Sequence, residues 1–409
     1  MTPVPSWKPN PLQQKLLDAC LLEDAQAWQA WKEWCDQIDV DAIDGGSYRL
    51  MPLAWKRLIS KGAEDPSGGR FKGVYRRSWY HNQLAMARTA DLIGKLTAAA
   101  IPAMLLKGAA LTVANYQDPG VRPMADIDVA VPRRLARQAV EALTQAGWTP
   151  GATPLTGAHN TGAVASSGWK VGPRPLSAFD EVYFCARHAH GFEEPTGLNV
   201  DLHWCLFQGN GDPGIDDEAW AGARPVTFHQ SQVLVPEAAV HLLLLVAHGS
   251  RWNPTPAIRW IADAVTLIRS EAEIRWDRLV AEARSRRITL QTLEMLGYLE
   301  ERFKVGVPAD VMAELRATAV SRRERAEYRV KSSQPGVRLG LHELRWLRER
   351  HRLLRKNEAG SQTPGFPTFM RHVLDAPSLM QLGAYAASEL TRRVRGSAQD
   401  QAGPKGTSA

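Results

Sequence analysis

The sequence has few cysteines, no long apolar run and no internal repeat, and each absence excludes a class of protein. Its four cysteines form no Cys-x-x-Cys pair, so neither a disulfide framework nor a zinc site of that kind is indicated. The longest apolar stretch, Ala238–Ala247, is interrupted by His241 and is far shorter than the roughly 20 residues of a membrane-spanning helix. The opening residues, MTPVPSWKPNP, lack the apolar core of a secretory signal. We therefore expect a cytoplasmic protein with reduced thiols.

Composition and charge are those of a globular protein, with one local exception. Hydrophobic residues make up 44% of the 409 residues and charged residues 23%, which excludes a fibrous or wholly disordered chain. The length is sufficient for two or three domains. The net charge is +7, and residues 320–356 alone carry +8 through 12 Lys or Arg against 4 Glu. That stretch is either the solvated face of an Arg-rich helix or a nonspecific site for an anionic partner.

Hydrophobic periodicity divides the chain into four regions. Residues 1–75 are predicted to be mainly helical, and residues 76–235 alternate between helical and strand patterns. Within the second region, residues 149–178 are rich in Gly, Pro, Ser and Thr, which predicts a long surface loop or insertion. Residues 236–395 return to helical patterns, and residues 396–409 are predicted to be a disordered tail. The expected fold class is therefore α+β, with helical regions on both sides of a mixed core.

Local patterns predict the elements of this core and of the first helices. The predicted order is helix 75–99, strand 103–106, helix 109–116, strand 126–131, helix 133–146, strand 181–187 and strand 198–206. A hairpin joins the last two strands, and we expect its residues His188 and His190 to be solvated. In the first region, the spacing of Trp28, Trp31 and Trp34 favours core packing of all three rings on one helix face.

The segment Asp-Ile-Asp-Val-Ala-Val at 126–131 carries the strongest chemical signal. Side chains alternate across a strand, so Asp126 and Asp128 project from one face while Ile127 and Val129 project into a core. Two carboxylates so close repel each other unless a cation lies between them. Mg²⁺ prefers oxygen ligands of this kind and bridges them to phosphates. The other interpretation is a pair of surface aspartates on an edge strand.

A second acidic residue lies in another strand-like run, Val-Asp-Leu-His-Trp at 200–204. Asp201 is flanked by apolar residues, where an unpaired carboxylate is unfavourable. It is either the third carboxylate of a metal site, or an ion-pair partner or strand-end cap. His203 shares the strand face of Asp201 and is an accessory candidate.

A lysine and a glycine stand between a predicted strand and a predicted helix. A helix N-terminus offers unpaired backbone N–H groups, and glycine allows close approach of the backbone, so Lys107 and Gly108 are candidate nucleotide-binding residues. Arg122, four residues before Asp126, either holds a triphosphate through its guanidinium or neutralises Asp126.

The helical region after residue 236 adds weaker candidates. His241 and His248 are seven residues apart and therefore share a helix face, although each is as readily a structural histidine. Arg259 and Asp263 are four apart and are expected to pair on their helix; Arg259 and His248 are further accessory candidates for nucleotide contact. No Cys/His cluster, and no serine or cysteine in a nucleophile-elbow motif, supports zinc or acyl-enzyme chemistry.

Taken together, these motifs resemble the uncharacterised nucleotidyltransferase family of the DNA-polymerase-beta-like superfamily. The resemblance rests on the Lys107-Gly108 turn, the Tyr-x-Asp-Pro-Gly-x-Arg stretch at 116–122, the Asp-x-Asp strand and the Leu-His-Trp strand. It covers residues 82–206 and continues more weakly through His248 and the segment 259–263.

The resemblance implies a small mixed sheet with packed helices that binds Mg²⁺ and a nucleoside triphosphate such as ATP. It implies Asp126, Asp128 and Asp201 as the catalytic carboxylates and metal ligands, holding two Mg²⁺ ions for nucleotidyl transfer. One departure concerns the wider superfamily, which has a Gly-Ser turn about a dozen residues before the first aspartate. Here Gly108 stands 18 residues before Asp126, and no serine follows it.

Two functions are compatible with the sequence. The first is an Mg²⁺-dependent nucleotidyltransferase that moves a nucleoside monophosphate to an unknown acceptor, whether a small molecule, a sugar, a peptide or an RNA. The alternative is a catalytically silent module of the same fold that engages a partner or RNA through its basic C-terminal half. Three mutually repelling acids favour the enzyme, because a silent module does not need them. The acceptor, the preferred nucleotide and the oligomeric state are left open.

Overall fold

The computed structural model describes residues 7–151, 174–208, 214–251, 257–332 and 364–373, together with scattered positions between 345 and 387. Most of the predicted loop at 149–178, the second half of the basic stretch 320–356 and the predicted tail at 396–409 lie outside the described residues. Within the described part of the chain, no helix combines the length and apolar character needed to cross a bilayer.

A mixed β-sheet forms the centre of the molecule. Its seven strands in the described chain are β1 (Met104–Leu105), β2 (Ile127–Ala130), β3 (Thr149–Pro150), β4 (Ala189–Glu193), β5 (Asn199–His203), β6 (Arg224–Phe228) and β7 (Ser231–Val235). They lie in the order β3-β4-β5-β2-β1-β7-β6. The pairs β2–β5 and β1–β7 are parallel, and the other neighbours are antiparallel. This confirms the expected α+β class with a mixed sheet.

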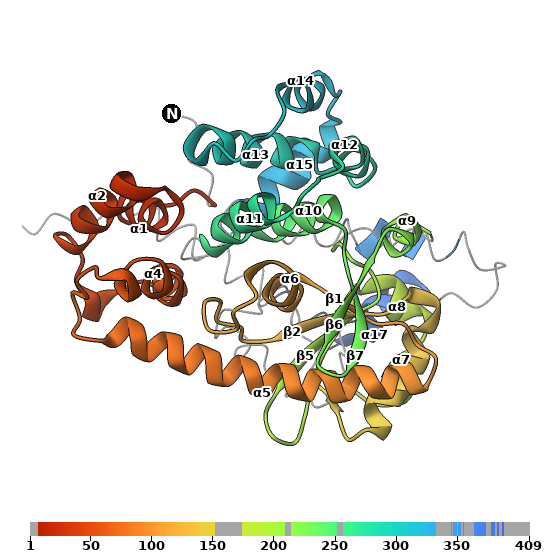
Figure 1. Cartoon of the computed structure of the whole chain (residues 1–409). Coiled ribbons are helices and arrows are strands. Elements are labelled where there is room, and N and C mark those ends of the chain that lie inside the picture. Colours follow the sequence, from red (N-terminus) through yellow and green to blue (C-terminus); the bar gives the residue numbers. More distant parts are fainter. Residues whose placement is uncertain are drawn as a thin grey trace, which may run out of the picture.

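The alternation of side chains gives the sheet two different faces. Leu105 and Val129 point into one hydrophobic core, which also holds Leu92 and Leu96 from the long helix α5 (Arg70–Ala98). Met104 and Ala130 point into a second core, which is shared with α10 (Ala238–Gly249) and α11 (Arg259–Ser270). In Figure 1, α5 lies along one side of the sheet, and α10 and α11 lie on the other. Asp128 is two residues before Ala130, so it projects toward α10 and α11.

Further helices surround these layers. The N-terminal group consists of α1 (Pro11–Leu21), α2 (Asp24–Cys35), α3 (Gly45–Tyr48) and α4 (Met51–Arg57), with short turns at Val40–Ala42 and Ile59–Lys61. Around the sheet lie α6 (Lys107–Leu111), a π-helical turn at Thr112–Tyr116, α7 (Ala136–Gln145), α8 (Glu181–Ala186) and α9 (Asp217–Ala221). The C-terminal group continues with α12 (Trp276–Ser285), α13 (Thr289–Phe303), α14 (Ala309–Ala317), α15 (Arg322–Lys331) and α17 (Phe366–Val373).

Local sequence explains why the first helix begins where it does. Asn10 caps α1, since its side chain accepts a hydrogen bond from the backbone N–H of Gln13, and the Gln13 side chain accepts one from the backbone N–H of Asn10. Pro11 then occupies the first helical position, where no backbone N–H is needed. The residues of α1 and those of α10 to α13 belong to one continuous hydrophobic core.

One predicted strand is wrong: residues 181–187 form the helix α8 instead. The Asp180 side chain accepts a hydrogen bond from the backbone N–H of Tyr183 at 2.9 Å and thereby caps the helix. Tyr183, Phe184 and Ala186 are buried together, so the aromatic residues that suggested a strand pack on one helix face. The strand itself follows as β4, where His190 is buried rather than solvated.

Other differences concern the edges of the core. The hairpin β6–β7 was not predicted; it extends the sheet beyond β1, with His229 at its turn in a left-handed conformation. The helix α5 begins at Arg70, five residues before the predicted start of the helix at 75. Of the three tryptophans, Trp31 and Trp34 are buried with their rings stacked 5.2 Å apart, whereas Trp28 is 44% exposed.

Candidate active site

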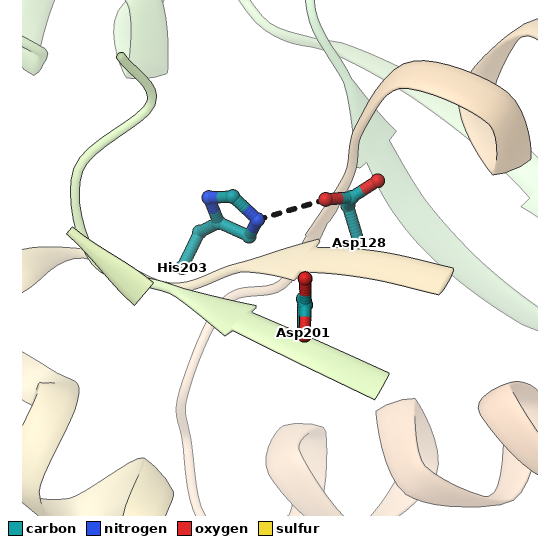
Figure 2. Close-up of side chains that lie close together, drawn as sticks. All are labelled: Asp128, Asp201 and His203. Atoms are coloured by element: carbon teal, nitrogen blue, oxygen red, sulfur yellow. Dashed lines mark hydrogen bonds and ion pairs between the residues drawn. The ribbon is translucent and has the colours of Figure 1, made fainter. Parts of the chain in front are cut away.

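Two parallel strands bring the candidate carboxylates side by side. The register of β2 and β5 pairs Asp128 with Asp201, and His203 projects from the same face two residues later. The side-chain ligand atoms of Asp128, Asp201 and His203 all lie within 4.8 Å of one another. Figure 2 shows the three side chains on one side of the strand pair. Residues distant in the sequence therefore form one cluster that is capable of holding a metal ion.

Asp128 is the most firmly held member of this cluster. Its Oδ1 accepts hydrogen bonds from Nζ of Lys107 at 2.5 Å and from Nε2 of His203 at 2.8 Å (Figure 2 shows the latter). Burial alone would raise the pKa of Asp128, but the charge of Lys107 and the hydrogen bond from His203 hold that pKa well below its usual range. Asp128 is therefore a carboxylate at neutral pH. Nδ1 of His203 is buried without a hydrogen-bond partner among the residues that the structure describes.

Asp126 stands at the outer end of the same strand, immediately before β2, and is exposed. The surrounding protein removes part of its hydration, and the negative charges of Asp128 and Asp201 add to this effect, so the pKa of Asp126 is raised. Lys107 and Arg259 offset only part of that rise. A group of carboxylates that disfavour one another's ionisation gains stability when a cation binds between them.

Lys107 and Gly108 follow β1 closely and are the first two residues of α6, so they lie at the strand-to-helix junction that the sequence predicts. Lys107 adopts a left-handed backbone conformation, with φ of 44°, which is strained for a residue with a side chain. Gly108 is packed against the guanidinium of Arg122, and a Cβ at this position would be only 2.0 Å from Nη1 of Arg122. The glycine is therefore required for close contact with an arginine of this chain.

Arg122 is buried and forms an ion pair with a residue from the helical half of the chain. Its Nε and Nη2 donate to the two carboxylate oxygens of Asp263 on α11, at 2.8 and 2.7 Å. The Tyr116 hydroxyl also donates to Asp263, at 3.0 Å. The predicted pairing of Arg259 with Asp263 is thus wrong, and Arg259 instead donates from Nη1 to the Pro123 carbonyl at 2.5 Å. A phosphate contact by Arg122 stays a prediction.

Several cationic or basic groups lie near the carboxylates. His248 keeps contact with solvent, but the surrounding protein desolvates its ring and the charges on Lys107 and Arg251 add to this effect, so its pKa is far below its usual value. Burial and the nearby His203 lower the pKa of His188 in the same way. His188 is half-buried, and its ring centre is 5.5 Å from that of His203, so the expectation of a solvated residue is wrong.

Sequence reasoning missed His188 and Arg251 as neighbours of the site. A signal for Arg251 was present, because it follows His248 by three residues and α10 ends between them. No comparable signal existed for His188, whose position depends on the chain reversal between α8 and β4.

The mixed sheet and the acidic cluster on two parallel strands define a protein of the nucleotidyltransferase-like α+β class. Comparison with known families then specifies it: the chain belongs to the uncharacterised nucleotidyltransferase family, whose model matches residues 47–304. This confirms the resemblance drawn from the sequence motifs. Among solved structures, an antigenic nucleotidyltransferase-like protein from Paracoccidioides brasiliensis is similar at 14% identity and a TM-score of 0.35, over 58% of this chain and 94% of that one. No curated protein matches the chain significantly.

Proposed function

We propose that this protein is an Mg²⁺-dependent nucleotidyltransferase that transfers a nucleoside monophosphate from a nucleoside triphosphate to an acceptor hydroxyl. The observation that carries the proposal is the parallel pairing of Asp128 with Asp201, which gathers two carboxylates and His203 within 4.8 Å. Family membership supports the same reaction class.

The residues present fit a divalent cation. Carboxylate oxygens are the ligands that Mg²⁺ prefers, and Asp126 lies close enough to Asp128 and Asp201 for their charges to add to the rise that desolvation causes in its pKa. Asp126, Asp128 and Asp201 would hold the two ions of the proposed site. When bound, Mg²⁺ would neutralise the triphosphate and make the acceptor hydroxyl more acidic. His203 keeps Asp128 oriented through the hydrogen bond to its Oδ1.

The chain's own residues have separate roles in the proposed transfer. The acceptor oxygen forms a bond to the α-phosphorus, the bond to the leaving pyrophosphate breaks, and the proton of the hydroxyl passes to Asp201. Asp201 suits this role because Lys107 and His203 both bind Asp128 and leave Asp201 without an ion-pair partner among the described residues. Lys107 places its charge beside the carboxylates, where it would also attract phosphate oxygens.

One cation just after α10 and one on α11 extend the proposed nucleotide site. Arg251 and Arg259 act electrostatically on Asp128 and Asp126, respectively, so both belong to the surroundings of the acidic cluster. We assign them, with His248, to the side of the site that receives the triphosphate, while Gly108 and Arg122 shape the turn that carries Lys107.

The test is release of pyrophosphate from each labelled nucleoside triphosphate in the presence of candidate acceptors. Asp128→Asn and Asp201→Asn are each expected to reduce turnover at least about 100-fold; the unfolding temperature should stay close to wild type in Asp201→Asn, whereas Asp128→Asn also removes the charge paired with Lys107 and should lower it. Asp277→Asn is the control, because that side chain on α12 is 76% exposed. Wild-type turnover by either site variant would refute the assignment. Absence of any Mg²⁺-dependent thermal stabilisation by nucleoside triphosphates would favour the silent module.

A further inference from the structure

The outward side of α5 exposes large aromatic side chains. Trp79 is 44% exposed, Tyr80 59% and Leu84 50%, whereas most large hydrophobic residues of the described chain are buried. α5 has 29 residues and runs along the outer edge of the molecule from the N-terminal helices to the sheet (Figure 1). The inner side of the helix already packs on the core through Leu92 and Leu96, so the outward side is left for another molecule.

The same helix is rich in unbalanced positive charge. No acidic residue occurs between Asp65 and Asp91, and that interval holds five Lys or Arg. Arg70 pairs with Asp41 and Arg88 approaches Glu194 at 3.9 Å. The other three, Lys72, Arg76 and Arg77, are exposed and have no carboxylate partner among the described residues.

These cations and rings lie on one face. Positions 72, 76, 79 and 80 have the i, i+4, i+7 and i+8 spacing of one helix face, and position 77 lies about 60° further around the helix from position 80, still on the exposed side. We call this set the α5 stripe; it consists of Lys72, Arg76, Arg77, Trp79 and Tyr80. At 100° per residue, Arg76 lies between Trp79 and Tyr80 around the helix, so charge and aromatic surface are interleaved.

We propose that the α5 stripe binds a single-stranded polynucleotide. Aromatic rings offer stacking surfaces for bases, and interleaved cations contact the phosphates between them. A membrane surface fits less well, because a helix lying on a bilayer keeps its apolar face free of charge and carries its cations on the other side. The inference requires binding only and stands independently of the proposed transfer reaction.

The helix that carries the stripe also forms hydrogen bonds to the loop that precedes Asp126 in the candidate active site. On the inner side of α5, Asn82 donates from Nδ2 to the carbonyls of Pro119 and Arg122, at 2.6 and 2.7 Å. The Tyr75 hydroxyl donates to Asp118 at 3.0 Å. The stripe therefore lies on the helix that holds the loop leading to Asp126, about one helix diameter, roughly 10 Å, from that loop.

The test is a fluorescence anisotropy titration of the full chain with a labelled 15-nucleotide RNA and with DNA of the same sequence. Trp79→Ala and Tyr80→Ala are each expected to weaken binding about 5- to 150-fold, the range for loss of one stacked base. Trp28→Ala is the matched control, since Trp28 on α2 has the same exposed fraction as Trp79. The control is expected to leave the dissociation constant unchanged.

Charge variants test the phosphate contacts separately. Replacing Lys72, Arg76 and Arg77 together by Gln is expected to reduce the slope of log K against log salt by about 2, at about 0.7 for each phosphate contact. The matched control replaces three exposed cations elsewhere, Arg134, Arg137 and Lys304, and removes the same charge.

The outcomes separate the possible partners. Loss of RNA or DNA binding in the stripe variants alone supports the proposal, and the stronger of the two ligands identifies the polynucleotide. Equal losses in stripe and control variants would overturn it, as would wild-type affinity in the stripe variants or no detectable binding by the wild-type chain. Phosphatidylglycerol vesicles form the last arm, and stripe-dependent vesicle binding without polynucleotide binding would also overturn the proposal.

Discussion

The packing of Gly108 against Arg122 yields a sharp prediction about stability. Alanine at position 108 would put its Cβ 2.0 Å from Nη1 of Arg122. An ordinary contact requires roughly 3.5 Å, so the guanidinium must retreat by about 1.5 Å. That movement breaks the hydrogen bonds of 2.8 and 2.7 Å to Asp263 and leaves a buried carboxylate without its charge partner.

The magnitude follows from the cost of breaking a buried ion pair. Removing one partner of a buried ion pair lowers the free energy of unfolding by about 3–5 kcal/mol. The alanine itself raises it by up to about 1 kcal/mol, because alanine is a better helix former than glycine. Gly108→Ala is therefore expected to lower the free energy of unfolding by about 2–4 kcal/mol, and Arg122→Met by about 3–5 kcal/mol. In the double variant no guanidinium obstructs the alanine. The loss of unfolding free energy in the double variant is therefore expected not to exceed the loss in Arg122→Met alone.

Urea unfolding of the four proteins of this cycle, followed by tryptophan fluorescence, measures the coupling. We expect a coupling free energy of about 3 kcal/mol between positions 108 and 122. Gly94→Ala is the matched control, since Gly94 is also helical but a Cβ there has no neighbour within 4 Å. The reasoning is refuted if Gly108→Ala is as mild as this control, or if the two single effects simply add.

Three further predictions follow from other contacts. Trp34→Ala should cost about 3–5 kcal/mol of unfolding free energy, and Trp28→Ala less than about 1 kcal/mol, because only the first ring is fully buried; urea unfolding checks both. Lys107→Met should lower turnover about 100-fold in the pyrophosphate assay by removing the cation beside Asp128, whereas wild-type turnover would contradict that role. Burial lowers the pKa of His241 to about 4; the charge of Arg122 acts in the same direction, while the hydrogen bond to the Lys107 carbonyl and the charges of Asp263 and Glu271 oppose it. The unfolded chain then binds the extra proton between pH 6.5 and 4, so stability should fall by up to about 3 kcal/mol as the pH drops through that window, and the fall should shrink in His241→Gln.

The sequence predicts the parts of the site that depend on local periodicity. The alternation of apolar and acidic residues at 126–131 and 200–204 gives each strand a polar face, and both strands form. Their parallel pairing is not local, since it joins segments about 70 residues apart through β4 and the chain around it. The family resemblance implies that the two acidic segments share one site, but neither it nor periodicity predicts the parallel pairing.

The ion pair of Asp263 was not predicted from the sequence, because its two residues are far apart in the chain. Arg259 and Asp263 have the spacing of a helical ion pair, yet Asp263 binds Arg122, which precedes it by 141 positions. Two parallel hydrogen bonds from the buried guanidinium of Arg122 satisfy both oxygens of the buried Asp263 carboxylate. For α8, a single capping aspartate outweighed the aromatic residues that favour a strand.

The stretch from Tyr116 to Arg122, one of the motifs on which the family resemblance rests, connects helices on the two faces of the sheet. Tyr116 and Arg122 both bind Asp263 on α11, while Asp118 accepts from the backbone N–H of Gly120 at 2.8 Å and from Tyr75 on α5. The polar side chains of the motif thus tie the loop before Asp126 to helices on both faces of the sheet. It follows that loss of this motif should first be measured as instability, whereas loss of Asp128 or Asp201 should first be measured as lost chemistry.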